Sequence, residues 1–378
     1  MNIKDVLKRT FLRKRTLLLL LFAVGYISLC VAKSSTYFAE MIFARHIFRV
    51  MSQGISLITG IFPFSLAEIM IILCPALVIA LIVGFIVKLV KNRKDWLHWV
   101  LTFFLNAAVM ASVVYFFYSF GCGINYYRYP LGSYLGLEIE PSSKEELKGL
   151  VTELADTASK LRSEISSVDE KGNYKLSGSA RDLAKKAKES YKILGKEYSL
   201  FGGLYPAPKC VLLSRLMSYT EITGIYTCWT MEANVDIDIP DYSIGSTMCH
   251  ELAHLRGFIR EDEANYISYL ACMASPDKEL QYSGVMHALV YAGNALSSAD
   301  GDMYAEVWYG HYSEEVRSDL VAAHEYWQQF EKTVVAETTE ALNDTYLKAT
   351  DQEEGTMTYG KVVDLLLAAY KKEHSEKN

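Results

Sequence analysis

Hydrophobic residues are unevenly distributed along this 378-residue chain, and three long apolar runs occupy its first third. The runs cover about residues 16–32, 64–87 and 99–124. The second run contains one charged residue, Glu68, and the third contains none. Because a helix needs roughly 20 predominantly apolar residues to cross a bilayer, we expect three transmembrane helices, the first of marginal length. The pattern predicts a multi-pass anchor over residues 1–124, with the lipid bilayer as its partner.

Basic residues indicate how this anchor is oriented. Residues 1–98 contain 13 of the chain's 38 Lys and Arg residues but only 4 of its 44 Asp and Glu residues. Most of these basic residues precede the first apolar run or separate the second from the third. Since loops rich in Lys and Arg stay on the cytoplasmic side of a membrane, we expect a cytoplasmic N-terminus and an extracytoplasmic domain over residues 125–378.

The segment between the first two runs carries a weaker apolar pattern. Tyr37–Ile58 has helical apolar spacing interrupted by Arg45, His46 and Arg49. Such a segment is typical of a helix that lies along the membrane surface, which is where we expect it. The alternative is a short lid over the outer domain.

Beyond residue 124 the pattern becomes that of a globular domain. Pro141–Ser167 and Ser179–Tyr198 have the spacing of amphipathic helices, the first with a serine cap. Lys209–Ser214 and Gly224–Ile239 are rich in β-branched and aromatic residues and are predicted strands. From Ala274 onward the chain is predicted to be helical. The expected fold class is therefore mainly α with a small β-sheet (α+β).

A helix is also predicted after Pro240, with Ser246 or Thr247 as its cap. It contains "CHELAH", in which His250 and His254 are four residues apart and leave the same face of a helix. In an H-E-x-x-H motif two neutral imidazoles hold zinc and the glutamate handles protons. We therefore predict one Zn²⁺ per chain, with Glu251 as general base.

The third ligand is predicted in "GFIREDEAN", because Gly257 can turn the chain back toward the metal. Glu261 is favoured, since it shares a helical face with Asn265, and Glu263 is the alternative. Asn265 is expected to hydrogen-bond a ligating histidine and fix its ring.

Other chemistry-bearing residues are less constrained by the sequence. Glu232 and Asn234 are candidate substrate contacts, because they lie on the predicted strand that we expect at the sheet edge. A donor for the oxyanion of a tetrahedral intermediate is also needed. The candidates are His287, His311, His324 and Tyr359, of which Tyr359 is favoured because it follows a glycine-containing turn.

The cysteines and the charge balance add two expectations for the outer domain. Cys210 and Cys228, on predicted neighbouring strands, are the expected disulfide in an oxidising compartment. Residues 99–378 carry 25 basic and 40 acidic residues, with no basic patch among aromatics. This charge balance excludes nucleic acid as an expected partner.

The motifs together resemble a known family. HExxH followed by a glutamate in an E-x-x-x-(D/N) setting resembles the gluzincin type of zinc peptidase. "TMEANVD", "CHELAHLRGFIREDEANYISYLAC" and "TYGKVVDLLLAAY", behind three apolar runs, resemble the bacterial domain-of-unknown-function family 3810. The resemblance implies a zincin-like extracytoplasmic domain of a membrane-anchored zinc metallopeptidase that acts on a peptide or protein. Two departures from the thermolysin pattern are the short interval after His254 and Asn265 in place of Asp.

Two other hypotheses stay open at the level of sequence. One is a non-catalytic membrane sensor or assembly factor that keeps the zinc fold for binding. The other has no metal, with His250 and His254 as ordinary polar residues on a helix face. Metal content distinguishes the second from the rest, and substrate turnover distinguishes the enzyme from the sensor.

Overall fold

The computed structural model describes residues 3–12, 14–331, 333–349 and 361–376, so the predicted Tyr359 lies outside the described residues. The chain divides into two compact units. The first comprises Met1–Phe48, Leu66–Arg128 and Cys228–Thr230, and the second comprises Arg49–Ser65, Tyr129–Thr227 and Met231–Asn378. The segment between the first two apolar runs is thus shared between the units.

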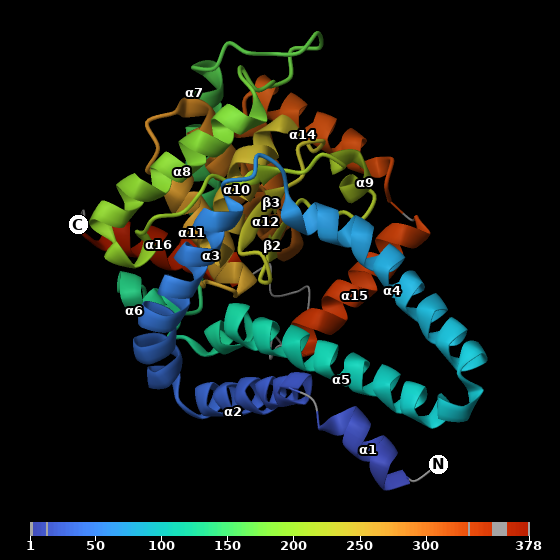
Figure 1. Ribbon diagram of the computed structural model, residues 1–378. Helices are drawn as coiled ribbons and strands as arrows, with labels where there is room; N and C mark the ends of the chain where they lie inside the picture. Colours follow the sequence, from blue (N-terminus) through green and yellow to red (C-terminus); the bar gives the residue numbers. More distant parts are fainter. Residues whose placement is uncertain (1–2, 13, 332, 350–360, 377–378) are drawn as a thin grey trace. The chain divides into compact units, whose positions relative to one another are not determined.

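The first unit is helical. Its elements are α1 (Ile3–Phe11), η1 (Lys14–Leu19), α2 (Leu20–Ser34), η2 (Phe38–Phe48), α4 (Leu66–Lys91), η3 (Arg93–Asp95), α5 (Trp96–Gly121) and η4 (Gly123–Tyr127) (Figure 1). Among the described residues, three stretches are long and apolar enough to cross a membrane, namely Lys14–Ser34, Leu66–Lys91 and Arg93–Tyr127. The three predicted apolar helices are confirmed, and they indicate a membrane protein.

η2 is a π-helix, in which hydrogen bonds join residues five apart. Accordingly, the Arg45 side chain reaches back five residues to the Glu40 carboxylate, at 2.9 Å. The buried Glu40 also accepts a hydrogen bond from Nε of Arg128, at 2.7 Å. The predicted single helix over Tyr37–Ile58 is therefore two helices, η2 in the first unit and α3 in the second.

The second unit combines helices with a small sheet. Its helices are α3 (Arg49–Thr59), α6 (Leu131–Leu135), α7 (Lys144–Ser163), α8 (Ala180–Glu197), η5 (Ser199–Phe201), α9 (Ser214–Ser218), α10 (Asp241–Leu255), α11 (Glu261–Met273), α12 (Lys278–Ala299), α13 (Gly301–Gly310), α14 (Glu314–Gln328), α15 (Val334–Ala349) and α16 (Val362–Glu376). Its strands are β1 (Lys209–Cys210), β2 (Gly224–Thr227) and β3 (Glu232–Val235). The predicted α+β composition, mainly helical with a small sheet, is confirmed over the described chain.

The sheet differs from the prediction in its topology. Its order is β1-β3-β2, with β1 parallel and β2 antiparallel to β3. Gly224–Ile239 was expected as one strand, but it folds into the hairpin β2–β3, with Met231 at a φ of 50° before β3. The strand with Glu232 and Asn234 is therefore central, and the expectation of an edge strand there is wrong.

The predicted disulfide is also wrong. Cys210 lies opposite Val235 in the β1–β3 register, whereas Cys228 follows the end of β2, in the turn of the hairpin. Both cysteines are free. The strands that contain or precede them are not paired with each other, because β3 lies between β1 and β2.

α10 begins earlier than predicted. It starts at Asp241, directly after Pro240, so the expected cap at Ser246 or Thr247 is wrong. The hydroxyls of Ser246 and Thr247 instead donate to the carbonyl of Ser243 inside the helix. An acidic residue in the first turn suits the positive end of the helix dipole.

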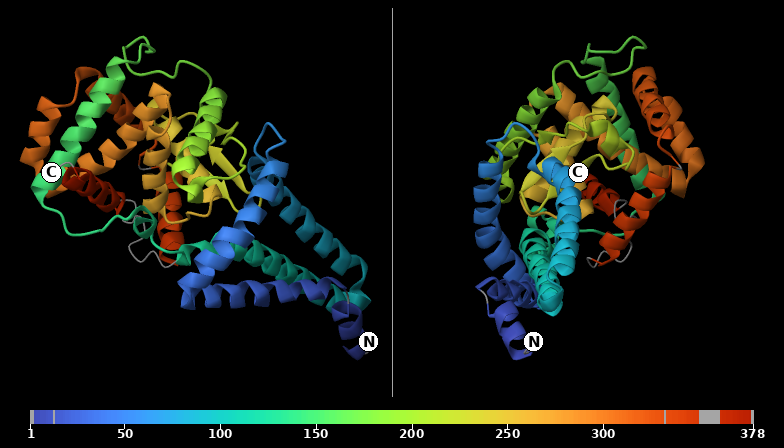
Figure 2. Two further views of the ribbon diagram at one scale, coloured as in Figure 1. Left: turned by 90° about the vertical axis from the view of Figure 1, so that its left-hand side faces the viewer. Right: turned by 45° about the vertical axis from the view of Figure 1, so that its right-hand side comes forward.

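α10 is enclosed by the rest of the second unit. It packs against α8, α11, α12 and the sheet, and Figure 1 shows it beside the strands and α12. The yellow to orange segments that contain these elements also lie together in the two views of Figure 2. Met248 and Leu252 are fully buried, and the Tyr191 hydroxyl of α8 donates to the Cys249 carbonyl at 2.6 Å. A helix held on so many sides gives the side chains of its last turns fixed positions.

Candidate metal centre

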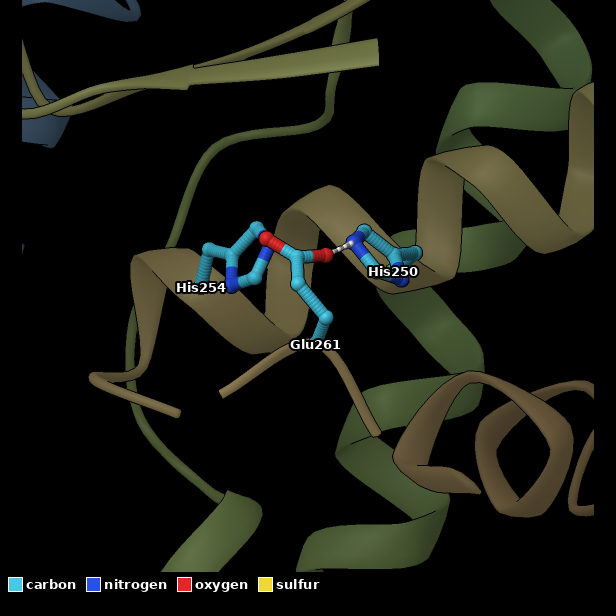
Figure 3. Close-up of side chains that lie close together, drawn as sticks. All are labelled: His250, His254 and Glu261. Carbon is cyan, nitrogen blue, oxygen red and sulfur yellow. Dashed lines mark ion pairs between the residues drawn. The ribbon is translucent and has the colours of Figure 1, made fainter. Parts of the chain in front are cut away.

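Two histidines at the end of α10 face one carboxylate. The rings of His250 and His254 lie 4.5 Å apart, centre to centre, because four residues make about one helical turn. The Glu261 carboxylate approaches both, with Oε2 3.1 Å from Nε2 of His250 and Oε1 3.6 Å from Nε2 of His254. Figure 3 shows this carboxylate between the two imidazoles. The structure thus brings together the three residues predicted as ligands.

The turn between α10 and α11 explains this meeting. α10 ends at Leu255, and Gly257 adopts a φ of 84°, a left-handed conformation that glycine reaches without strain. Backbone hydrogen bonds from Gly257 to His254 and from Phe258 to Ala253 close the turn. Glu261 is then the first residue of α11, so its side chain begins just beside the end of the preceding helix.

The spacing of these atoms fits a metal ion. A single ligand atom from each of the three residues can be chosen so that all lie within 4.8 Å of one another. Ligand atoms placed 2.0–2.1 Å from a tetrahedral zinc ion would lie about 3.3–3.4 Å apart. The imidazole nitrogens lie 3.1 Å and 3.6 Å from the Glu261 carboxylate, each from a different oxygen, and these separations are close to that value. These three side chains could hold zinc with small adjustments.

The electrostatics of the cluster are those of a strong ion pair. Burial opposes the ionisation of Glu261, but the charge of His254 and the close approach of both imidazoles hold its pKa well below the usual range. Burial likewise lowers the pKa of His254, and the Glu261 carboxylate outweighs it, raising that pKa to about 9. Without a metal, a proton on His254 therefore takes the place of the cation.

His254 is oriented by the backbone. Its Nδ1 lies 2.7 Å from the carbonyl oxygen of Phe258, which can only accept a hydrogen bond. Nδ1 therefore carries a proton, and Nε2 is the atom turned toward Glu261. A ligating histidine usually has such a partner on its other nitrogen. The orienting role that the sequence suggested for Asn265 is filled at His254 by a carbonyl of the turn.

Glu251 stands beside the cluster without joining it. Its side chain is buried, and its Oε2 has no hydrogen-bond partner in the structure. Burial raises the pKa of Glu251 to about 7, even though the nearby histidines favour its ionised form. A buried carboxylate oxygen without a partner is costly, so this atom is available to a group that a metal site would bring, such as a water molecule.

A glycine on β2 makes room for this carboxylate. A Cβ atom added to Gly224 would collide with Oε1 of Glu251 and would lie 2.8 Å from both its Cγ and Cγ2 of Thr247. The sequence alone does not indicate Gly224, because a glycine at the start of a strand resembles any turn residue. Gly224 matters because β2 packs against α10, where the absence of a Cβ leaves space for Glu251.

Two polar side chains of α12, His287 and Tyr291, lie near the cluster and Asn265. Nε2 of His287 lies 3.2 Å from Oδ1 of the buried Asn265. Burial and the charge of His250 lower the pKa of His287 to about 3, so its ring is neutral at neutral pH. Burial and the charge of Glu261 raise the pKa of Tyr291 to about 12, although the neighbouring Asn265 favours the ionised form. His287 was a sequence candidate, but Tyr291, one helical turn further, was missed.

Glu263, the alternative third ligand, is engaged elsewhere. Its Oε1 accepts a hydrogen bond from the backbone N–H of Leu131 at 2.6 Å and pairs with Arg260. Arg260 also donates to the carbonyl of Tyr129. Glu263 therefore ties the start of α11 to the segment before and within α6.

The remaining candidates lie outside the cluster. Glu232 is buried on β3 and pairs with Lys209, and Asn234 donates to backbone and side-chain oxygens of the hairpin. His311 contacts Asp156 and His324 contacts Gln328, both at exposed positions. These contacts give each of the four residues a structural partner other than His250, His254 and Glu261.

A family described as "Protein of unknown function (DUF3810)" matches residues 43–367 of this chain. The chain belongs to this family. The matched range includes His250, Glu251, His254 and Glu261, together with two of the three apolar helices in full. No curated protein and no solved structure matches the chain. The family resemblance expected from the sequence is confirmed, and the family description itself assigns no activity.

Proposed function

We propose that this chain is a membrane-anchored zinc peptidase that hydrolyses peptide or protein substrates outside the cytoplasmic membrane. The observation that supports it most is the meeting of His250, His254 and Glu261 beside a buried glutamate, Glu251, with a vacant hydrogen-bonding oxygen. Three protein ligands with one open position are typical of catalytic rather than structural zinc. The expected location outside the membrane rests on the distribution of basic residues.

A zinc ion held by the three ligands would supply the Lewis acidity that polarises a water molecule and the substrate carbonyl. Glu251 would then take a proton from the attacking water and deliver it to the leaving amine. Burial raises the pKa of Glu251 in the metal-free site, and a raised pKa makes a carboxylate a stronger base toward the attacking water.

Tyr291 is the donor that we assign to the developing oxyanion. Its phenol stays protonated at neutral pH, lies against Asn265, and is close enough to Glu261 to respond to its charge. His287, neutral and hydrogen-bonded to Asn265, holds that amide in place. A preorganised donor of this kind is typically worth a factor of about 10²–10³ in kcat.

The sheet favours a peptide as the substrate. β2 is an edge strand in the order β1-β3-β2, and its Gly224 lies directly over Glu251. An extended peptide can add to such an edge by backbone hydrogen bonds. A peptide bound along β2 would pass close to the proposed general base.

The test is hydrolysis of a mixed-sequence peptide library by the purified full-length chain, read by mass spectrometry. We expect cleavage that stops on chelation, returns with zinc, and is abolished by His254→Ala. Tyr291→Phe should lower kcat about 10²-fold with little change in KM or zinc content. An unchanged kcat in Tyr291→Phe would show that Tyr291 is not the oxyanion donor. Hydrolysis that continues after zinc is removed would overturn the proposal as a whole.

A further inference from the structure

α9 is polar on the inside and apolar on the outside. Ser214 and Ser218 are buried, where Ser214 accepts from the backbone N–H of Ile237 and Ser218 donates to Asp236. The leucines around them point the other way, and Leu212 and Leu216 are 70% and 61% exposed. This is the reverse of the arrangement expected for a helix that faces water, because apolar side chains gain free energy when they leave water.

A second set of exposed apolar side chains lies near the end of α3. Ile58, Ile61 and Phe62 are exposed, Ile61 at 76%. We call these three residues together with Leu212, Leu213 and Leu216 the apolar edge. Several exposed apolar side chains on neighbouring segments of a folded domain favour an interaction surface.

The two parts of the apolar edge are tied to each other. The buried Lys209 of β1 donates to the carbonyls of Thr59 and Phe64, each at 2.8 Å, and pairs with Glu232. Upstream, Gln53 accepts from the backbone N–H of Leu204 at 2.7 Å. The residues that lead into β1 therefore run alongside α3 and the segment that follows it.

Chain continuity places this edge near a bilayer. Phe64 stands two residues before α4, which begins at Leu66 and is one of the three helices able to cross a membrane. Leu212 follows Lys209 by three residues, a reach of at most about 10 Å. Because Lys209 is fixed to the Phe64 carbonyl, Leu212 lies near Phe64, which the chain joins to the membrane-crossing segment within two residues.

We propose that the apolar edge inserts into the interfacial region of the membrane crossed by α4, so that the second unit rests on the lipid surface there. Interfacial segments bury their apolar faces about 5–10 Å into the boundary between headgroups and acyl chains. Leucine, isoleucine and phenylalanine side chains suit that layer. The proposal requires α4 to span a bilayer, and it requires neither zinc nor catalysis.

The membrane contact of the apolar edge also bears on where substrates come from, a step that rests on the proposed function. β2 lies two strands from β1 in the sheet, a distance of about 10 Å. A peptide bound along β2 would therefore lie close to the lipid surface. Substrates held at or near the membrane would reach the metal centre more readily than free soluble proteins.

The experiment uses the full-length chain, reconstituted into vesicles of phosphatidylethanolamine and phosphatidylglycerol, with a photoreactive benzoylphenylalanine at one position. The test positions are 61 and 216. The matched control is position 168, where the exposed Val168 (45%) lies between α7 and α8. Position 79 is the positive control, since Ile79 is an exposed residue near the middle of α4.

After illumination, mass spectrometry should find lipid adducts at positions 61 and 216 at yields comparable with position 79, and several-fold above position 168. Yields at 61 and 216 no higher than at 168 would overturn the proposal. Covalent dimers of the chain at 216 would also overturn it, since a second copy would then cover the edge. A lack of adducts at 79 would overturn the premise that α4 crosses the bilayer, and the proposal with it.

Discussion

Six residues separate His254 from Glu261, and the turn that they form does two tasks at once. Gly257, in a left-handed conformation, returns the chain so that Glu261 faces both imidazoles. The same turn presents the Phe258 carbonyl to Nδ1 of His254. A connection of this length therefore suffices to bring Glu261 to both imidazoles and to orient the ring of His254.

The choice between the two acidic residues of this region is testable. Glu261→Ala removes a ligand, so zinc affinity should fall by more than the roughly 10–100-fold that loss of a ligand-orienting residue costs. Glu263→Ala should leave zinc affinity nearly unchanged and lower the free energy of unfolding by about 1–3 kcal/mol, because Leu131 and Arg260 lose their partner. Zinc titration of both variants measures the change in affinity, and denaturant unfolding measures the change in the free energy of unfolding. The reverse order of zinc loss would make Glu263 the ligand.

Zinc binding should release a proton. In the metal-free site the Glu261 carboxylate outweighs burial and raises the pKa of His254 to about 9, so His254 is protonated at neutral pH. Zinc requires the neutral imidazole, and apparent zinc affinity should therefore rise as pH rises toward about 9. Calorimetric titration at pH 7 in buffers of different ionisation enthalpy should show release of about one proton. A binding heat independent of the buffer would contradict the ion pair.

At the residue scale, the sequence could indicate which side chains lie together only where they are close along the chain. His250 and His254 share a face because of the helical repeat, and Glu261 lies close along the chain. Gly224 and Tyr291 reach the site from other elements, so no spacing in the sequence could indicate them. Tyr359, the favoured oxyanion donor, lies outside the described residues.

At the scale of elements, helices were easier to predict than the sheet. The amphipathic helices α7 and α8 begin at the serine caps Ser143 and Ser179. The sheet depends on pairing between distant segments, and Gly224–Ile239 has no glycine or proline at the hairpin turn to indicate one. β3 is buried along its whole length, so the alternation typical of an edge strand is absent.

The approach of β2 to α10 gives a prediction at this scale. In Gly224→Ala the new methyl group would meet Glu251 and Thr247, so the Glu251 carboxylate must move. We expect hydrolysis to fall by up to about a hundredfold, with zinc content retained and a loss of about 1–3 kcal/mol in the free energy of unfolding. Gly301→Ala is the matched control, because a Cβ there meets nothing within 4 Å. Equal activity of the two variants would separate β2 from catalysis.

At the scale of the whole molecule, the sequence predicted the three apolar helices and the change to a mixed α and β composition after them. It did not predict that Arg49–Ser65 belongs with the second unit, because that grouping depends on packing against the segment from Gly202 to Lys209. The family match extends over both units, from residue 43 to residue 367.

The charge distribution predicts the topology. An alkaline phosphatase fused after Asn378, which is active only outside the cytoplasm, should be active. A fusion after Asn92, in the basic loop that follows α4, should be inactive. Activity in the opposite pattern would place the metal centre in the cytoplasm and reverse the orientation.

Glu251→Gln in the full-length chain tests whether the proposed metal centre hydrolyses peptides. Glutamine keeps the shape of the side chain but cannot act as a base, and Glu251 is not one of the three proposed ligands. Zinc content and thermal unfolding should match the wild type, while peptide-library hydrolysis should fall by about 10²-fold or more. A Glu251→Gln protein that cleaves peptides as fast as the wild type would contradict the account.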